Sequence, residues 1–225
     1  MKRTKLDDRI LPDYTKGDEI FNSVTHMVGG ALGICATVLC VIFAAINGSV
    51  YGVIGGAIFG ASMILMYTIS AVYHLLSPKL KAKKVMQVLD HCTIFFLIAG
   101  TYTPVALCSI REYSTWLGWT VFGVVWAAAI LGIVFNSIDL KKYKKFSMIC
   151  YLAMGWCVIV IVDKIPIIFH PTEFILILAG GIAYTIGAVL YGVGSKKPRM
   201  HAIFHIFTII ASLLQFLAIL LYTVR

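Results

Sequence analysis

Long apolar segments constrain this chain more than any other feature. Crossing a hydrocarbon core takes about 20 apolar residues, and runs of that kind follow one another along nearly all of the 225 residues. Charged residues make up only 13% of the chain, against about a quarter in soluble domains. Because a backbone in lipid must satisfy its own hydrogen bonds, we expect helices. They are predicted at residues 19–46, 51–76, 85–108, 116–136, 146–163, 173–192 and 200–224.

The connections between these segments are too short to form a soluble domain. The sequence therefore predicts an all-α fold, a seven-helix transmembrane bundle over residues 19–225, preceded by a cytoplasmic arm over residues 1–18. The arm is charged throughout and lacks the apolar core of a secretory signal. We therefore expect the first helix to be retained as a membrane anchor.

Lysine and arginine cluster in alternate connections. All but three of the 19 lie in the arm and in the second, fourth and sixth connections, the exceptions being Arg111, Lys164 and Arg225. The positive-inside rule places the basic side in the cytoplasm, so the N-terminus is expected inside and the C-terminus outside. Lysines in such short loops suit anionic lipid head groups. For this reason the net charge of +9 is not taken to indicate nucleic-acid binding.

Glycines recur every four residues in the first two helices, at positions 29 and 33 and at positions 52, 56 and 60. Small residues at this spacing let two helix backbones approach closely. One interpretation is the seam of a homodimer. The favoured one is close packing inside a single bundle, because bundle interiors use the same residues.

A set of ionisable residues falls at one depth, near the cytoplasmic ends of three predicted helices. His74 ends the second helix, Asp90 lies about 9 Å into the third at 1.5 Å per residue, and His201 and His205 begin the seventh. Ionisable groups are costly inside a bilayer and usually mark function. The set therefore indicates a functional site.

The spacing of these residues indicates a metal centre. His201 and His205, four apart, share one helix face and can bind one ion. With His74 they supply three imidazoles, which leaves one position of tetrahedral Zn²⁺ open, as in catalytic sites. The donors also suit other divalent metals that prefer imidazole. The alternative is that each histidine only forms a hydrogen bond to a neighbouring helix.

Asp90 and Ser70 are the predicted catalytic groups. An unpaired carboxylate in an apolar span needs compensation, which a divalent cation would provide. Asp90 could then accept a proton from a water or hold that water in line. Ser70, one turn before His74, would orient Asp90 or donate a hydrogen bond to a developing oxyanion.

The first helix adds a polar stripe of Glu19, Asn22 and His26, spaced three and four residues apart. These side chains could bind the ion themselves. With three histidines already available, however, they are assigned to hydrogen bonds that hold the ligands or to helix packing. His91 points about 100° away from Asp90 on the same helix and is interpreted as a packing or substrate-side residue.

Taken together, the motifs resemble the hemolysin III branch of the progestin and adipoQ receptor family, within the wider CREST-type superfamily of membrane hydrolases. In chain order they are Glu19-x-x-Asn22-x-x-x-His26, Ser70-x-x-x-His74, Asp90 and His201-x-x-x-His205. The resemblance implies zinc on the residues that match His74, His201 and His205. It also implies that Asp90 acts through a water, with Ser70 nearby. The short arm resembles bacterial members, which implies the bacterial inner membrane.

Three classes of function remain open. The superfamily includes alkaline ceramidases, which implies a zinc-dependent hydrolase that cleaves a lipid amide or ester, such as a ceramide-like membrane lipid. The second class is a non-enzymatic sensor or regulator of membrane lipid state or energetics, with structural zinc. The third is a cytolysin, implied by the hemolysin name. A pore requires a polar lining, yet polar residues become scarce beyond the inner third of the predicted bundle.

Overall fold

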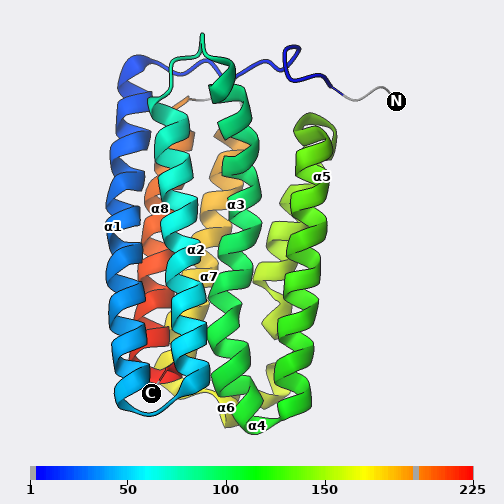
Figure 1. Ribbon diagram of the computed structural model, residues 1–225. Coiled ribbons are helices and arrows are strands. Elements are labelled where there is room, and N and C mark those ends of the chain that lie inside the picture. Colours follow the sequence, from blue (N-terminus) through cyan, green and yellow to red (C-terminus); the bar gives the residue numbers. More distant parts are fainter. Residues whose placement is uncertain (1–3, 195–197, 225) are drawn as a thin grey trace.

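The computed structural model describes residues 4–194 and 198–224, and all regular structure among them is helical. Figure 1 shows the long helices running side by side along one axis. They are α1 (Lys16–Ile46), α2 (Val50–Leu75), α3 (Lys81–Val105), α5 (Thr115–Gly155), α7 (Pro171–Gly194) and α8 (Pro198–Ala218). Shorter segments connect or extend them: η1 (Ala106–Ile110), α4 (Arg111–Tyr113), η2 (Cys157–Lys164), α6 (Ile165–Ile168) and η3 (Ile219–Thr223).

Helix α1 starts earlier than the hydropathy pattern predicts. Thr15 Oγ1 accepts a hydrogen bond from the Asp18 backbone N–H, and the Asp18 carboxylate accepts one from the Thr15 backbone N–H. This reciprocal pair satisfies two N–H groups that the first turn leaves free. As a result, Lys16 is already helical and Glu19 has a fixed direction.

Helix α5 reverses direction at Asp139, whose backbone is non-helical (φ −158°, ψ 96°). Asn136 and Tyr151 lie on opposite sides of this break, yet both donate hydrogen bonds to the His91 carbonyl of α3, at 3.4 and 2.7 Å. In one straight helix, 15 residues would separate them by about 22 Å. The two halves therefore lie beside each other, and Figure 1 shows the chain turning back at the end of α5.

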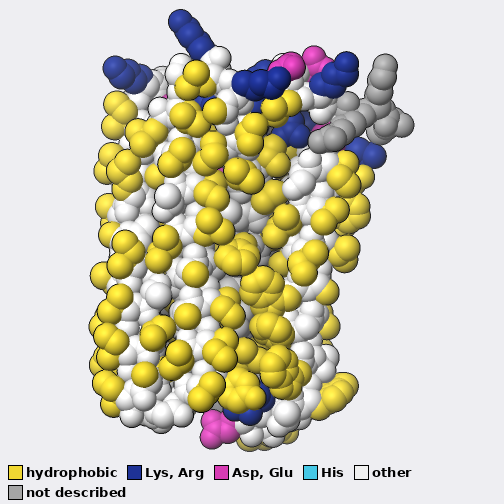
Figure 2. All heavy atoms as spheres, in the orientation of Figure 1, with side chains coloured by type: hydrophobic (Ala, Val, Ile, Leu, Met, Phe, Trp, Pro, Cys, Tyr) yellow, Lys and Arg dark blue, Asp and Glu magenta, His cyan; other side chains and the backbone are white. Residues whose placement is uncertain are grey.

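Six helical segments in the described chain are long and apolar enough to cross a membrane, and the reversed one spans Thr115–Ile168. Large apolar side chains such as Ile54, Val124 and Leu131 point outward. Figure 2 shows this apolar flank, with Lys and Arg side chains gathered at the end where α1 begins. We call that end, marked by Lys79, Lys81 and Lys84, the basic end. An apolar flank with basic residues at one end is typical of a membrane helical bundle.

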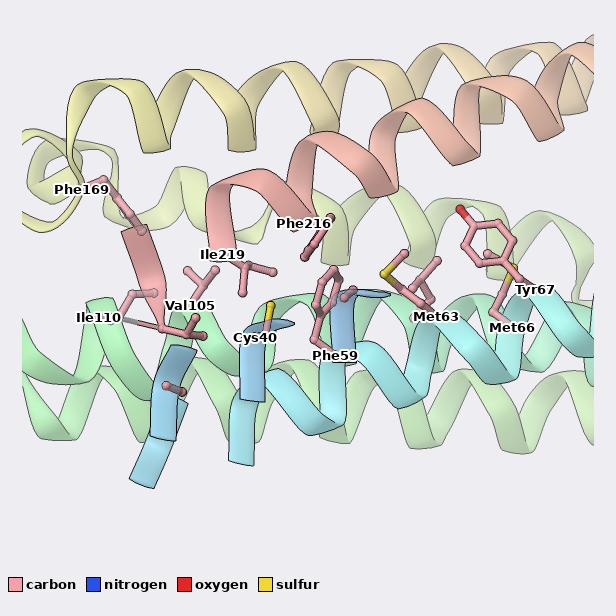
Figure 3. Close-up of a cluster of buried hydrophobic side chains, with 14 of the residues drawn as sticks. Cys40, Phe59, Met63, Met66, Tyr67, Val105, Ile110, Phe169, Phe216 and Ile219 are labelled. Carbon is pink, nitrogen blue, oxygen red and sulfur yellow. The ribbon is translucent and has the colours of Figure 1, made fainter. Parts of the chain in front are cut away.

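The half of the bundle away from the basic end is tightly packed. In Figure 3, Phe59 and Met63 of α2 meet Phe216 of α8 and Ile219 of η3, and all four are buried. Tyr67 extends the cluster toward the basic end, where its hydroxyl donates to Ser212 Oγ at 2.7 Å. Helices α1, α2 and α8 thus pack against one another on the side of the histidines that faces away from the basic end.

Glycines bring α1 and α2 into close contact. A Cβ atom on Gly33 would lie 2.9 Å from the Ile64 backbone nitrogen, and one on Gly56 would lie 2.8 Å from Cys40 Cβ. Neither position has room for a side chain. These glycines therefore pack two helices of the same chain together, which is the interpretation favoured from their spacing. A homodimer stays a prediction.

Candidate metal centre

Three buried histidines meet at the basic end of the bundle. His74 lies in the last turn of α2, and His201 and His205 lie in the first turns of α8. One ring nitrogen from each lies within 4.8 Å of the others, and the Nε2 atoms of His201 and His205 are 3.0 Å apart. Two nitrogens on one tetrahedral zinc would be about 3.3 Å apart. The three rings therefore fit a single ion.

The ring of His74 is held in one orientation by a carboxylate. Its Nδ1 lies 2.5 Å from Glu19 Oε2 and donates a hydrogen bond to it. In a neutral ring the lone pair is then on Nε2, which is buried and has no hydrogen-bond partner in the part of the chain that the structure describes. Metal-binding histidines commonly donate their other N–H to a carboxylate in this way. A neutral imidazole with a buried free lone pair is a suitable zinc ligand.

Glu19 also binds a lysine. Its Oε1 accepts a hydrogen bond from Lys83 Nζ at 2.5 Å, and Lys83 is only 1% exposed. The positive-inside reasoning counted Lys83 among the lysines that face the head groups, and this was wrong. A signal was available: Lys83 lies seven residues before Asp90, two helical turns away, so both residues occupy the same face of α3.

The rest of the polar stripe of α1 also faces this site. The ring of His26 stacks on that of His205, with centroids 3.8 Å apart and planes 23° apart. Both ring nitrogens of His26 and both polar side-chain atoms of Asn22 are buried without a hydrogen-bond partner among the described residues. His26 lies outside the group of three ligand nitrogens. The structure thus brings Glu19 against His74 and His26 against His205.

Asp90 and Ser70 lie on a cavity that reaches the histidines. Both line it together with His201 and His205, and Asp90 has 13% of its side chain exposed. Asp90 is not one of the candidate ligands, which among the described residues are the three histidines alone. Its carboxylate lies 3.6 Å from His91 Nδ1. The structure therefore places the two predicted catalytic residues on the wall of the same cavity that His201 and His205 line.

The rest of the cavity wall is mostly apolar or aromatic. It runs between α3, α5, α7 and α8 and is lined by Leu97, Ile98, Tyr102, Leu152, Trp156, Tyr184 and Phe204, among others. Along α3 alone, the wall extends from Asp90 to Tyr102, which is about 18 Å of helix. An elongated apolar cavity with a polar end is suited to a long amphipathic molecule.

His91 lines the same cavity without joining the three histidines. Its Nδ1 lies 2.8 Å from the Gln87 carbonyl and its Nε2 lies 2.9 Å from the Tyr191 hydroxyl. The carbonyl can only accept, so Nδ1 donates to it and Nε2 accepts from Tyr191. Both nitrogens are therefore occupied, and His91 is a wall residue of the cavity.

The N-terminal arm covers the centre from the basic end, a contact that the sequence did not indicate. The Tyr14 ring stacks on His201. Farther along the arm, Asp7 pairs with Lys81 at 2.8 Å and the Thr4 backbone N–H donates to Asp139 Oδ2 at 2.8 Å. Burial raises the pKa of the Tyr14 phenol, so this ring stays neutral at physiological pH.

Comparisons with known proteins identify the family of this chain. The family model described as "Haemolysin-III related" matches residues 14–216, a range that contains every candidate site residue. The chain is 37% identical over 205 residues to "Hemolysin-3" of Bacillus cereus, covering 91% of each chain. It is 38% identical over 212 residues to "Hemolysin-3 homolog" of Bacillus subtilis (strain 168), covering 94% of this chain and 97% of that protein.

A more distant relative is the human "Monocyte to macrophage differentiation factor". It is 27% identical over 177 residues, which cover 75% of this chain and 70% of that protein. This relative fits the wider receptor family that the motifs resemble. Across most of its length, therefore, the chain belongs to the haemolysin-III-related family, and its apolar helices indicate a multi-pass membrane protein.

Proposed function

We propose that this chain is a zinc-dependent hydrolase of lipid amide or ester bonds, with a ceramide-like substrate, in the bacterial inner membrane. One observation carries the proposal. Two of the three clustered histidines, His201 and His205, line an elongated and mostly apolar cavity whose wall also carries Ser70 and Asp90. Ligands, acid–base groups and a place for a lipid chain thus occur together.

His74, His201 and His205 would hold the zinc ion, which would supply the Lewis acidity that polarises a carbonyl and acidifies a water. Asp90 would accept the proton of the attacking water, because it lines the same cavity as His201 and His205 and is not one of the candidate ligands. Ser70 would donate a hydrogen bond to the carbonyl oxygen as negative charge develops there. The apolar wall would hold the acyl chain and exclude water.

The proposed topology has seven membrane crossings, with the N-terminus in the cytoplasm and the C-terminus outside. The reversal of α5 at Asp139 supports an odd number of crossings. The lysines of the basic end support its cytoplasmic position. A C-terminal alkaline phosphatase fusion is expected to be active in intact cells. An inactive fusion beside an active fusion at the α1–α2 turn would overturn the proposed count.

A non-enzymatic role is the second candidate. The histidines join α2 to α8, and Glu19 adds α1 through its contact with His74. An ion at this point would also act as a clasp between helices, which is what a sensor or regulator with structural zinc requires. The two candidates differ in whether the purified protein releases a product.

The deciding experiment combines elemental analysis of the purified protein with mass spectrometry of a lipid amide and ester panel. We expect about one zinc per chain, as the single His₃ set implies, and hydrolysis of at least one lipid. Asp90→Ala should keep the zinc and lose the hydrolysis, whereas His205→Ala should lose both. Zinc without any product would favour the clasp, and hydrolysis by Asp90→Ala would contradict the proposed acid–base role. Because the Bacillus relatives carry the name hemolysin, lysis of erythrocytes is a third readout, which tests the cytolysin alternative.

A further inference from the structure

We propose that Lys83 is a positioning residue for the metal ligand His74 and acts through the carboxylate of Glu19. The proposal rests on the zinc site proposed above. Three elements supply the three residues: Lys83 lies on α3, Glu19 on α1 and His74 on α2. The two contacts that join them, Lys83 Nζ to Glu19 Oε1 and Glu19 Oε2 to His74 Nδ1, are both 2.5 Å long.

Lys83 is placed unlike its neighbours in the sequence. Its side chain is 2% exposed, whereas that of Lys81, two residues earlier on the same helix, is 64% exposed. An ammonium group removed from water is strongly unfavourable unless it is paired and hydrogen-bonded. An ordinary head-group lysine would point toward solvent, as Lys81 does. The burial of Lys83 therefore needs a specific set of partners.

The partners of Lys83 match its three N–H donors. Besides Glu19 Oε1, Nζ lies 2.9 Å from the Leu76 carbonyl and 3.5 Å from the His74 carbonyl. Both carbonyls are at the C-terminal end of α2, where the backbone lacks helical donors and attracts positive charge. Lys83 is thus linked to His74 in two ways. It lies near the His74 carbonyl, and it binds the Glu19 carboxylate, which accepts a hydrogen bond from the His74 ring.

The effect on His74 follows from this geometry. Glu19 has 17% of its side chain exposed, so without Lys83 it could turn toward water. The ring of His74 would then lose its acceptor on Nδ1 and, with it, the fixed direction of Nε2. Removing such outer partners of a ligand typically weakens metal binding by about 10- to 100-fold. Lys83 therefore prepares His74 for the ion before the ion binds.

A purely structural role for Lys83 makes a different prediction. A lysine that only caps α2 and joins α3 to α1 would change the stability of the fold and leave zinc affinity alone. If Lys83 acts through Glu19, its removal must have little further effect once Glu19 is already changed. A double-mutant cycle separates these cases, because residues that act through one contact are not additive.

The experiment measures zinc affinity of the full-length protein in detergent by competition with a chelating indicator. Lys83→Met and Glu19→Gln are each expected to weaken binding by about 10- to 100-fold, and the double variant no more than Glu19→Gln alone. Lys81→Met is the matched control and should stay within about twofold, since an exposed ion pair contributes little. Cobalt substitution gives an independent signature: the visible absorption band should change in Lys83→Met and stay unchanged in Lys81→Met.

If Lys83→Met does not yield monodisperse protein, Lys83→Gln retains a hydrogen-bond donor and should show an intermediate loss of affinity. Wild-type affinity in either variant, or additive losses in the double variant, would overturn the role of Lys83. These results leave the zinc site intact. A wild-type protein that binds no zinc would instead overturn the site itself, together with this role.

Discussion

The ring of Tyr14 stacks on the ring of His201, with their centroids 5.0 Å apart and their planes inclined by 23°. Tyr14 belongs to the arm that precedes α1, and His201 belongs to the first turn of α8. Residues from opposite ends of the chain thus meet over the candidate metal centre. The arm separates one proposed ligand from the solvent beyond the basic end.

Tyr14→Ala is expected to expose the centre. Loss of the stacked ring removes the cover over His201, so a chelator added to zinc-loaded protein should extract the ion several-fold faster. Stopped-flow chelation with a coloured chelator measures this rate. Ile10→Ala is the control, because Ile10 lies in the same arm and is 88% exposed. Equal extraction rates for Tyr14→Ala and wild type would show that the arm does not limit access.

Zinc removal is expected to lower the thermal stability of the protein. An ion that binds only the folded state at 100 times its dissociation constant contributes about 2.7 kcal/mol. The melting temperature should therefore fall on chelation in the wild type and should not respond in His205→Ala. His170→Ala is the control and should respond to chelation as the wild type does, since His170 lies at the end of the bundle away from the basic end and stacks on Tyr222. A wild-type melting curve that is unchanged by chelation would argue against a bound ion.

Alanine at Gly56 is expected to destabilise the bundle. The added methyl group would lie 2.8 Å from Cys40 Cβ, so α1 and α2 would have to separate. Overpacking of this kind costs about 1–3 kcal/mol. Gly123→Ala is the matched control, because a Cβ there meets nothing within 4 Å. In mixed detergent, wild type and Gly123→Ala should have similar free energies of unfolding, both higher than that of Gly56→Ala. Any other order contradicts the close packing of α1 and α2.

Removal of the Asp139 carboxylate should weaken the reversal of α5. Asp139 Oδ1 accepts hydrogen bonds from the backbone N–H groups of Lys141 and Lys142, both at 3.1 Å, and thereby caps the returning half. Loss of such a cap costs about 0.5–2 kcal/mol. Asp139→Ala should therefore melt at a lower temperature than wild type, and Asp139→Asn should recover much of the loss. Similar melting of all three proteins would assign the turn to tertiary packing instead.

Hydropathy and helical periodicity account for most of the fold and for the composition of the candidate site. Apolar runs located most of the long helices to within a few residues, because the membrane requires a fixed length of apolar helix. The run at residues 146–163 is the exception, since it is α-helical only as far as Gly155 and continues as the 3-10 segment Cys157–Lys164. The i, i+4 spacing of His201 and His205 placed both on one face. His74 could be added from its depth alone.

What the sequence left out depends on contacts between distant segments. Lys83 resembles any other basic residue beside a membrane helix until α1 supplies Glu19 as its partner. The stacking of Tyr14 on His201 joins residues far apart in the chain. Neither periodicity nor composition carries information of that kind. Grouping Lys83 with the head-group lysines therefore followed from its charge and its position beside a membrane helix, but it took no account of the contact with Glu19.

The contacts of α1 also limit how that helix can move. Glu19 touches His74 and, two turns later, His26 stacks on His205. Sliding α1 along its axis by a single turn, about 5.4 Å, would separate both pairs at once, and a one-residue insertion between them would rotate one partner away by about 100°. By its composition, α1 would only anchor the protein in lipid. These two contacts fix its position along its own axis, and α1 forms the side of the site against which His74 and His205 are aligned.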